Sequence, residues 1–241
     1  MTKTRAPIFI LTALLLAACG TRETQPPAVS PAAAFEEVTI NTQDGRQLAG
    51  RIYGEGEVAV ILAHMLSRGH SQLNWAFFAE ELAGRGYTVL TFDFRGMGKS
   101  SGNIQQEVHL TRIDAATAIQ YLQGRAYEKI VCIGASMGGT ACLSAALETD
   151  LSGVVSLSAP DSMGAPTELT RADLAGLAIP KLFIFAQDDQ PYAGENRQMY
   201  QDAAEPKDIH VFSGGGHGTN LFNTGHRDEL MQLIFDFLEG F

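Results

Sequence analysis

The strongest chemical signal in the sequence is the pentapeptide Gly134-Ala-Ser-Met-Gly138, a G-x-S-x-G pattern between an apolar run and a helical run. In a turn that joins a strand to a helix, the serine takes a strained backbone conformation, and the flanking glycines leave space that a Cβ atom would fill. A chain with 25 glycines can contain the pentapeptide by chance, but its position between a strand and a helix favours a function. The pattern predicts that Ser136 is a nucleophile.

A serine hydroxyl needs a base that removes its proton, and histidine is the usual base. Of the six histidines, His217 follows three glycines in the segment Ser213-Gly-Gly-Gly-His-Gly218, directly after the last apolar run. A glycine-rich loop there would let an imidazole reach across the sheet. The other candidates have weaker settings, because His210 lies inside that apolar run and His226 opens the final helical segment. We predict that His217 is the base.

The base in turn needs a carboxylate that fixes its tautomer. Asp188 and Asp189 follow the apolar run 181–185, at the C-terminal end of a predicted strand, where open α/β sheets bind their ligands. The position of these two acids favours both equally at this stage. Either one would complete a chain order of serine, aspartate and histidine.

The elements that must position these residues follow an alternating pattern. Short apolar runs predict buried strands, and the amphipathic stretches between them predict helices, which together indicate a mostly parallel sheet covered on both faces. A hairpin-like pair across Asp44-Gly45 comes first. The predicted strands are 36–41, 47–53, 58–63, 88–92, 129–134, 153–157, 181–185 and 209–212, and the predicted helices are 71–85, 110–124, 137–148, 192–204 and 223–239.

The order Ser, Asp, His on such a framework resembles the α/β-hydrolase family over residues from about Phe35 to Phe241. The segment Asp93-Phe-Arg-Gly-Met-Gly-Lys-Ser100 strengthens the resemblance, because it matches the D-x-R-G-x-G-x-S segment common after the fourth strand of that family. The resemblance implies an α/β fold with a mostly parallel sheet of about eight strands and a Ser-His-Asp triad. The family's G-x-x-D pattern aligns with 186–189 and selects Asp189, although Ala186 replaces the glycine and Asp188 remains an alternative.

The longer stretch 92–102, "FDFRGMGKSSG", also resembles a phosphate-binding loop. A G-x-x-x-x-G-K-[ST] loop requires a glycine at position 93, which is an aspartate, and a G-x-G-x-x-G loop requires one at position 101, which is a serine. Both nucleotide patterns therefore fail by one position. The resemblance instead implies a structural loop in which Asp93 and Arg95 form a fixed network.

The same resemblance implies an oxyanion hole built from two backbone amides. One belongs to Met137, the residue after the serine, and the other to Leu66, counted from His64 in the loop after the third strand. The family usually has His-Gly at this point, whereas this chain has Met65 after the histidine. Because glycine reaches backbone angles that methionine disfavours, the shape of this loop is an open question.

The N-terminal segment has the features of a secretory signal. Lys3 and Arg5 precede the apolar run 8–18, which is too short to span a bilayer that needs about 20 helical residues. The run ends in Leu16-Ala-Ala-Cys19, which resembles the lipobox of bacterial lipoproteins. We therefore expect a signal peptide over 1–18 and acyl chains on Cys19. Gly20 in place of aspartate favours the outer membrane of a bacterial envelope over the inner membrane.

A tether would follow the lipid, and a single domain would follow the tether. Residues 21–34 carry three prolines and small side chains without helical or strand periodicity, so we expect 19–34 to link the membrane to a domain over 35–241. Two further cysteines, Cys132 and Cys142, fall on a predicted strand and the helix after it. We expect them to be buried free thiols, because these two layers lie about 10 Å apart and a disulfide needs Cα atoms within ~7 Å.

Charge and composition exclude some classes of binding partner. The formal net charge of −10 disfavours polyanions, and no basic run with interleaved aromatic residues appears, so nucleic acid is set aside. No cluster of histidines and carboxylates has the spacing of a metal site, and no organic cofactor is implied. The sequence predicts a serine hydrolase that acts on a small or medium ester. The alternatives are a thioesterase, amidase or lactonase of the same fold, or a non-catalytic envelope protein that binds a ligand. The oligomeric state is left open.

Overall fold

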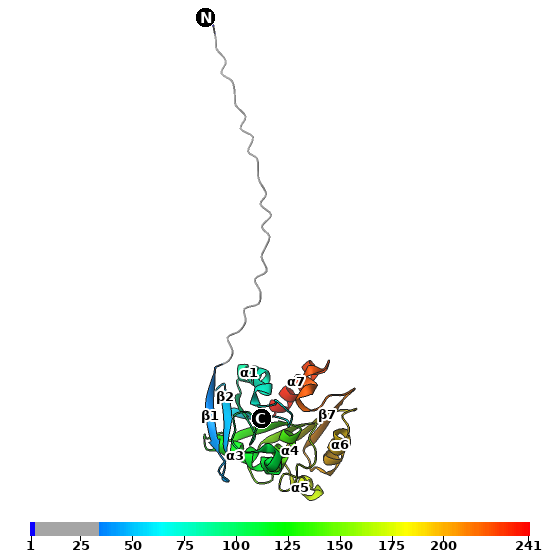
Figure 1. Ribbon diagram of the computed structural model, residues 1–241. Coiled ribbons are helices and arrows are strands. Elements are labelled where there is room, and N and C mark those ends of the chain that lie inside the picture. The colour runs from blue at the N-terminus through cyan, green and yellow to red at the C-terminus, as the bar shows by residue number, and fades with distance from the viewer. Residues whose placement is uncertain (3–33) are drawn as a thin grey trace. The chain divides into compact units, whose positions relative to one another are not determined.

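The computed structural model describes residues 1–2 and 34–241, and residues 34–241 belong to one compact unit (Figure 1). The predicted signal peptide, the acylation at Cys19 and most of the tether lie outside the described residues. Within the described part of the chain, no helix is both long and apolar enough to cross a membrane.

The unit is built on a single sheet of eight strands in the order β1-β2-β4-β3-β5-β6-β7-β8. β1 and β2 pair antiparallel to each other, β2 pairs antiparallel to β4, and all other neighbours are parallel. The α/β fold with a mostly parallel sheet is thus confirmed. The strands are β1 (Phe35–Asn41), β2 (Gln47–Tyr53), β3 (Val58–Ala63), β4 (Thr88–Phe92), β5 (Lys129–Ala135), β6 (Gly153–Leu157), β7 (Lys181–Ala186) and β8 (Lys207–Phe212).

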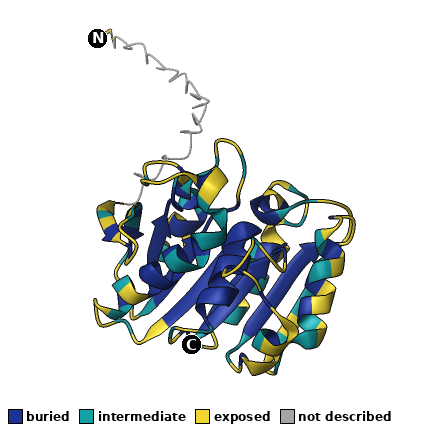
Figure 2. Ribbon diagram, turned by 60° about the horizontal axis from the view of Figure 1, so that its bottom comes forward, coloured by how far each residue is buried: buried dark blue, intermediate teal, exposed yellow. Residues whose placement is uncertain are grey.

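The central strands are buried on both faces, which explains why their sequences are continuously apolar (Figure 2). Neighbouring residues of β3 point to opposite sides: Val60 and Leu62 join one core cluster, and Ile61 and Ala63 join the other. β2 lies near the edge and alternates over most of its length, with Leu48, Gly50 and Ile52 buried and Gln47, Ala49 and Arg51 more exposed. The sheet therefore separates two hydrophobic cores.

Helices cover both faces of the sheet (Figure 1). Aromatic residues of α1 and α7, among them Phe78 and Phe235, fill one core, while α3, α4, α5 and α6 close the other. The helices are α1 (Ala76–Gly84), α2 (Ile104–Glu107), α3 (Thr111–Gln123), α4 (Met137–Ala145), α5 (Arg171–Gly176), α6 (Tyr192–Asp202) and α7 (Arg227–Leu238), with 3-10 turns at Gln72–Trp75, Val108–Leu110 and Gly218–Asn223. The sequence missed α2, which has a single turn, and α5 is the only helix between β6 and β7 in the described chain.

Cys132 and Cys142 form a disulfide, so the prediction of two free thiols is wrong. Their Cα atoms lie 5.8 Å apart, well inside the range for a disulfide. The layer spacing of about 10 Å refers to the helix axis, whereas the facing Cα atoms lie ~2.3 Å nearer to the sheet. Gly138 and Gly139 at the start of α4 bring the helix still closer, because a Cβ on Gly138 would overlap the Ala63 carbonyl.

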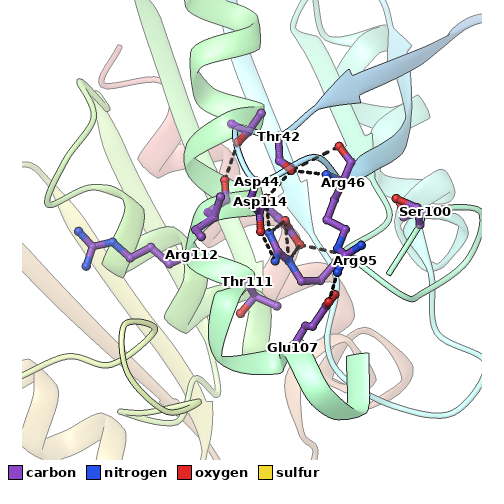
Figure 3. Close-up of polar contacts among 12 residues, drawn as sticks. Thr42, Asp44, Arg46, Arg95, Ser100, Glu107, Thr111, Arg112 and Asp114 are labelled. Carbon is purple, nitrogen blue, oxygen red and sulfur yellow. Dashed lines mark hydrogen bonds and ion pairs between the residues drawn. The ribbon is translucent and has the colours of Figure 1, made fainter. Parts of the chain in front are cut away.

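The loop after β4 is a fixed polar network rather than a phosphate site. Asp93 accepts hydrogen bonds from the backbone amides of Gln72, at 2.7 Å, and Lys99, at 2.9 Å. Arg95 is fully buried, and its guanidinium donates to both Asp114, at 2.6 Å, and Asp44, at 2.7 Å (Figure 3). These bonds tie the loop to the β1–β2 turn and to α3.

Candidate active site

Ser136 lies in the sharp turn between β5 and α4, with an unusual backbone conformation for a serine. Its φ is +50° and its ψ is −120°, and its amide donates to the Leu157 carbonyl of β6 at 2.8 Å. The flanking glycines permit the turn: a Cβ on Gly134 would overlap the Gly138 carbonyl. The strain predicted for a G-x-S-x-G turn is therefore present at Ser136, and the turn leaves its side chain at the N-terminus of α4.

Three side chains from the ends of three parallel strands form a continuous hydrogen-bonded chain. His217 Nε2 lies 2.8 Å from Ser136 Oγ, and His217 Nδ1 lies 2.9 Å from Oδ2 and 3.2 Å from Oδ1 of Asp189. With the imidazole proton on Nδ1, this nitrogen donates to the carboxylate while Nε2 accepts from the serine hydroxyl. The arrangement can transfer a proton from Ser136 to His217 and hold the resulting imidazolium beside a carboxylate.

Loop geometry selects Asp189 over Asp188 as the partner of His217. Asp189 is nearly buried and its amide donates to Ala186, whereas Asp188 is exposed and its amide donates to Gly214 in the loop that carries His217. The backbone bond at Asp188 holds these two loops side by side. It leaves Asp189 as the acid whose side chain reaches the imidazole.

The other histidines near the C-terminus lie away from the serine. His210 Nε2 is 3.4 Å from Glu229, and His226 Nε2 is 3.1 Å from the Ser213 carbonyl. The glycine-rich loop 213–218 brings His217 to the serine with help from three residues of positive φ, at Gly214, Gly216 and Gly218. Their backbone freedom is what the sequence GGGHG supplies.

Tyr192 contacts the site but was missed by the sequence analysis. Its ring lies 4.3 Å from the His217 imidazole, centroid to centroid, at an interplanar angle of 36°. Tyr192 begins α6 only three residues after Asp189, so one short segment supplies both the carboxylate and the aromatic ring that contact the imidazole. A tyrosine that closely follows a candidate acid is a weak signal, since its direction depends on the helix that it begins.

The two amides expected for an oxyanion hole have no competing partner. Neither the Leu66 nor the Met137 amide donates a hydrogen bond to another described residue. Met65, which replaces the usual glycine, has no positive φ and buries its sulfur against the Thr219 hydroxyl at 3.1 Å. The loop thus accommodates methionine through packing under the His217 loop, while the Leu66 side chain is 41% exposed.

His64 is a buried, neutral side chain that helps to hold the loop after β3. Burial lowers its pKa, and its Nε2 accepts a hydrogen bond from the Phe94 amide at 3.1 Å. Its Nδ1 lies 3.0 Å from the Met65 carbonyl, so His64 connects the loop after β3 to the loop after β4. Over residues 34–241, no group of three or more His, Cys, Asp or Glu side chains is arranged to hold a metal ion.

Comparisons with known proteins agree with this architecture. A family model described as the alpha/beta hydrolase fold matches residues 58–180. Uncharacterized protein YfhR of Salmonella typhi is 33% identical over 125 residues, which cover 48% of this chain and 41% of that protein. YfhR of Escherichia coli K12 is 23% identical over 231 residues, which cover 84% of this chain and 80% of that protein. An esterase of Pyrococcus furiosus superposes with a TM-score of 0.74 at 19% identity, over 87% of this chain and 93% of the esterase, which is a likeness of fold.

Proposed function

The chain belongs to the alpha/beta hydrolase fold family, and from that premise we propose that it is a serine hydrolase that cleaves small or medium carboxylic esters. The observation that carries the proposal is the hydrogen-bonded chain from Ser136 through His217 to Asp189. Its three members come from the carboxyl ends of β5, β7 and β8, where a substrate can reach them. Similarity in fold to an esterase supports the choice of reaction without fixing the substrate.

The first half of the proposed reaction transfers the acyl group to the enzyme. His217 Nε2 takes the Ser136 proton while Oγ attacks the ester carbonyl carbon, and the carbonyl oxygen becomes an oxyanion. The amides of Met137 and Leu66 donate to that oxyanion, which is the largest single source of stabilisation in reactions of this type. The tetrahedral intermediate collapses, the bond to the alcohol oxygen breaks, and His217 returns the proton to the departing alcohol.

The second half regenerates the serine. Water replaces the alcohol, His217 takes one of its protons, and the hydroxide oxygen attacks the acyl-enzyme carbonyl. Collapse of the second intermediate releases the carboxylic acid and restores the Ser136 hydroxyl. Asp189 stabilises the imidazolium in both halves and keeps the imidazole in the tautomer that can accept the serine proton.

A labelling experiment tests the proposal against a binding protein that merely keeps the fold. We expect a fluorophosphonate probe to form an adduct on Ser136, located by mass spectrometry of the digested protein. The Ser136→Ala variant should remain unlabelled, and a His226→Ala variant, which alters a histidine outside the hydrogen-bonded chain, should label like the wild type. If the wild-type protein is neither labelled nor active on esters, the proposed serine hydrolase function is contradicted.

We also propose that the enzyme works from a lipid anchor at Cys19 in a bacterial envelope. The sequence of residues 1–20 supports this, and the Cys132–Cys142 disulfide supports export, because disulfides persist mainly in oxidising compartments. In a bacterium that processes lipoproteins, Cys19→Ser should move the protein from the membrane pellet to the soluble fraction. Unchanged pelleting would contradict anchoring through this cysteine.

A further inference from the structure

A cleft of about 520 Å³ lies against the loop that carries Leu66. It is lined by residues 66–71 of the loop after β3, by 96–98 of the loop after β4, and by Ile104 and Gln105 of α2. Because Leu66 contributes both a side chain to the cleft and the amide proposed for the oxyanion, the cleft adjoins the place where an ester carbonyl would bind.

The ionisable side chains that line the cleft are an arginine and a histidine. Arg68 lines it and forms no ion pair with any described residue, and His70 lines it with neither ring nitrogen bonded to a residue in 34–241. Nδ1 of His70 is buried, which leaves Nε2 as the nitrogen available to a ligand. No aspartate or glutamate is among the lining residues, although the protein as a whole carries a net charge of −10.

The acidic side chains that flank the lining segments in sequence are already engaged. Asp93 accepts from the Gln72 and Lys99 amides, and Glu107 is paired with Arg46. Neither carboxylate is therefore free to neutralise Arg68. A guanidinium without an acidic partner at a cleft wall suits a carboxylate, which it can bind through two parallel hydrogen bonds.

The segment that carries Arg68 and His70 is held in place by hydrogen bonds. The His70 amide donates to the Ser67 carbonyl at 3.0 Å, which closes a turn around Arg68. Ser71 then caps the 3-10 turn Gln72–Trp75 and bonds reciprocally with Asn74. Met97 and Ile104, whose side chains are mostly buried in the core, contribute the apolar part of the lining, which suits the methylene groups of a substrate.

We propose that this cleft binds an anionic group of the substrate, so that the preferred substrates are esters whose acyl or alcohol part ends in a carboxylate. The inference rests on the proposed serine hydrolase function and specifies its substrate class. Methylene groups lie along Met97 and Ile104, the terminal carboxylate binds Arg68, and His70 donates a further hydrogen bond. The ester carbonyl then lies beside the Leu66 amide.

Matched substrates test the proposal. The 4-nitrophenyl monoester of adipic acid and 4-nitrophenyl hexanoate have acyl chains of equal length and differ in the terminal carboxylate. We expect the wild type to favour the adipate ester in kcat/KM. In Arg68→Gln the preference should fall about tenfold, the usual scale for a lost hydrogen bond to a charged group. Arg171→Gln, which alters an exposed arginine on α5 outside the cleft, should retain it. Hydrolysis by Ser136→Ala sets the background.

The outcomes separate the two proposals. Equal rates for the two esters, a preference for the hexanoate, or a preference that Arg68→Gln leaves unchanged would overturn the anionic cleft, while hydrolysis that requires Ser136 would still support the serine hydrolase. If neither ester is hydrolysed in a manner that requires Ser136, the proposed serine hydrolase function is contradicted. The anion-binding role of the cleft is then tested by ligand binding. In that case a rise in Tm with free adipate that Arg68→Gln abolishes supports the cleft, and no rise overturns it.

Discussion

Two polar clusters of this protein use similar residues in opposite ways. Around Arg95, a fully buried guanidinium donates to two carboxylates, and its partner Asp114 is itself fully buried (Figure 3). Around Ser136, the carboxylate of Asp189 bonds a histidine whose side chain is 23% exposed. The first cluster joins three segments of the chain into one rigid loop. The second lies open to the solvent on one side.

The difference lies in how completely each cluster is satisfied. Arg95 is fully buried and each of its three guanidinium nitrogens donates to Asp44 or Asp114, so its donors are already engaged within the protein. Beside Ser136, the Leu66 and Met137 amides bond to no described residue, and the serine itself is held in a strained turn. A saturated cluster contributes to stability, whereas a cluster with preorganised but unused donors can stabilise a transition state.

The largest difference between the two clusters should appear when Ser136 is replaced. We expect Ser136→Ala to lower kcat by about 10³-fold to 10⁶-fold, because the triad acts as a unit, while leaving the fold intact. Ester hydrolysis measures the first effect and thermal unfolding the second. Wild-type turnover in this variant would remove Ser136 from the mechanism.

The buried carboxylate should show the reverse pattern. Asp114→Ala leaves Arg95 buried with one fewer partner, so we expect the free energy of unfolding to fall by about 3–5 kcal/mol. Folded molecules should keep their kcat. Asp150→Ala, at an exposed aspartate whose side chain pairs with no described residue, is the matched control and should unfold like the wild type. Denaturant unfolding measures both, and equal stability of the two variants would contradict the comparison.

Lowering the pH should affect the Ser136 site and the Arg95 cluster differently, without any substitution. Activity should fall in acid, since a protonated imidazole cannot accept the serine proton. Burial raises the pKa of Asp114, whereas Asp44, the other partner of Arg95, should keep its charge. Burial also favours a higher pKa for Asp44, but hydrogen bonds from Arg95 and Thr42 prevail and lower it. A lowered carboxyl pKa contributes stability that is lost only as pH falls through it, below the usual value of about 3.9. On acidification kcat/KM should therefore fall, while the contribution of the Arg95–Asp44 ion pair to Tm persists until the pH drops below that usual value.

A smaller effect should follow from the ring that supports His217. Tyr192→Leu removes an aromatic face 4.3 Å from the imidazole, and we expect kcat/KM to fall about tenfold, the scale of a cation–π interaction between the ring and the imidazolium. Tyr192→Phe keeps the ring and should retain most activity. Equal reductions of kcat/KM in the two variants would assign the effect to the hydroxyl instead.

The smallest effect concerns substrate length. The connection between β6 and β7 supplies only α5, a helix of six residues, so little apolar surface covers the site. At ~25 cal/mol per Å² of buried surface, methylenes that remain in water add almost nothing to binding. Esters with short acyl chains of about two to six carbons should be cleaved better than those of twelve or more, with and without detergent micelles. A kcat/KM that rises steadily with length in both conditions would contradict an open site.

Much of this framework could be predicted from the sequence because its signals are local. The hairpin signal at Asp44-Gly45 and the apolar runs after it located every strand to within two residues, and the G-x-S-x-G turn located the strained Ser136. Contacts between distant segments were harder. The partners of Arg95 lie 51 and 19 residues away, and nothing in the spacing identifies Asp44 or Asp114.

The disulfide shows why the remainder could not be predicted. Whether Cys132 and Cys142 meet depends on how closely α4 approaches the sheet, a distance set by glycines whose effect on packing emerges only when the chain is folded. The same holds for the cleft, in which Arg68 comes from the loop after β3 and Met97 from the loop after β4. Sequence order alone does not place these two loops at the same cleft.

The disulfide also constrains when the cross-link can form. Both sulfur-bearing residues are fully buried, and the ten-residue separation between them encloses Ser136. Thiol–disulfide exchange requires a thiolate to reach one of the sulfurs, so small reductants have no access while the chain stays folded. The two sulfurs meet where α4 packs on the sheet, and in the folded chain the bond between them is shielded. The oxidation state of a mature molecule therefore reports the surroundings in which it folded, whatever the redox conditions in which it later works.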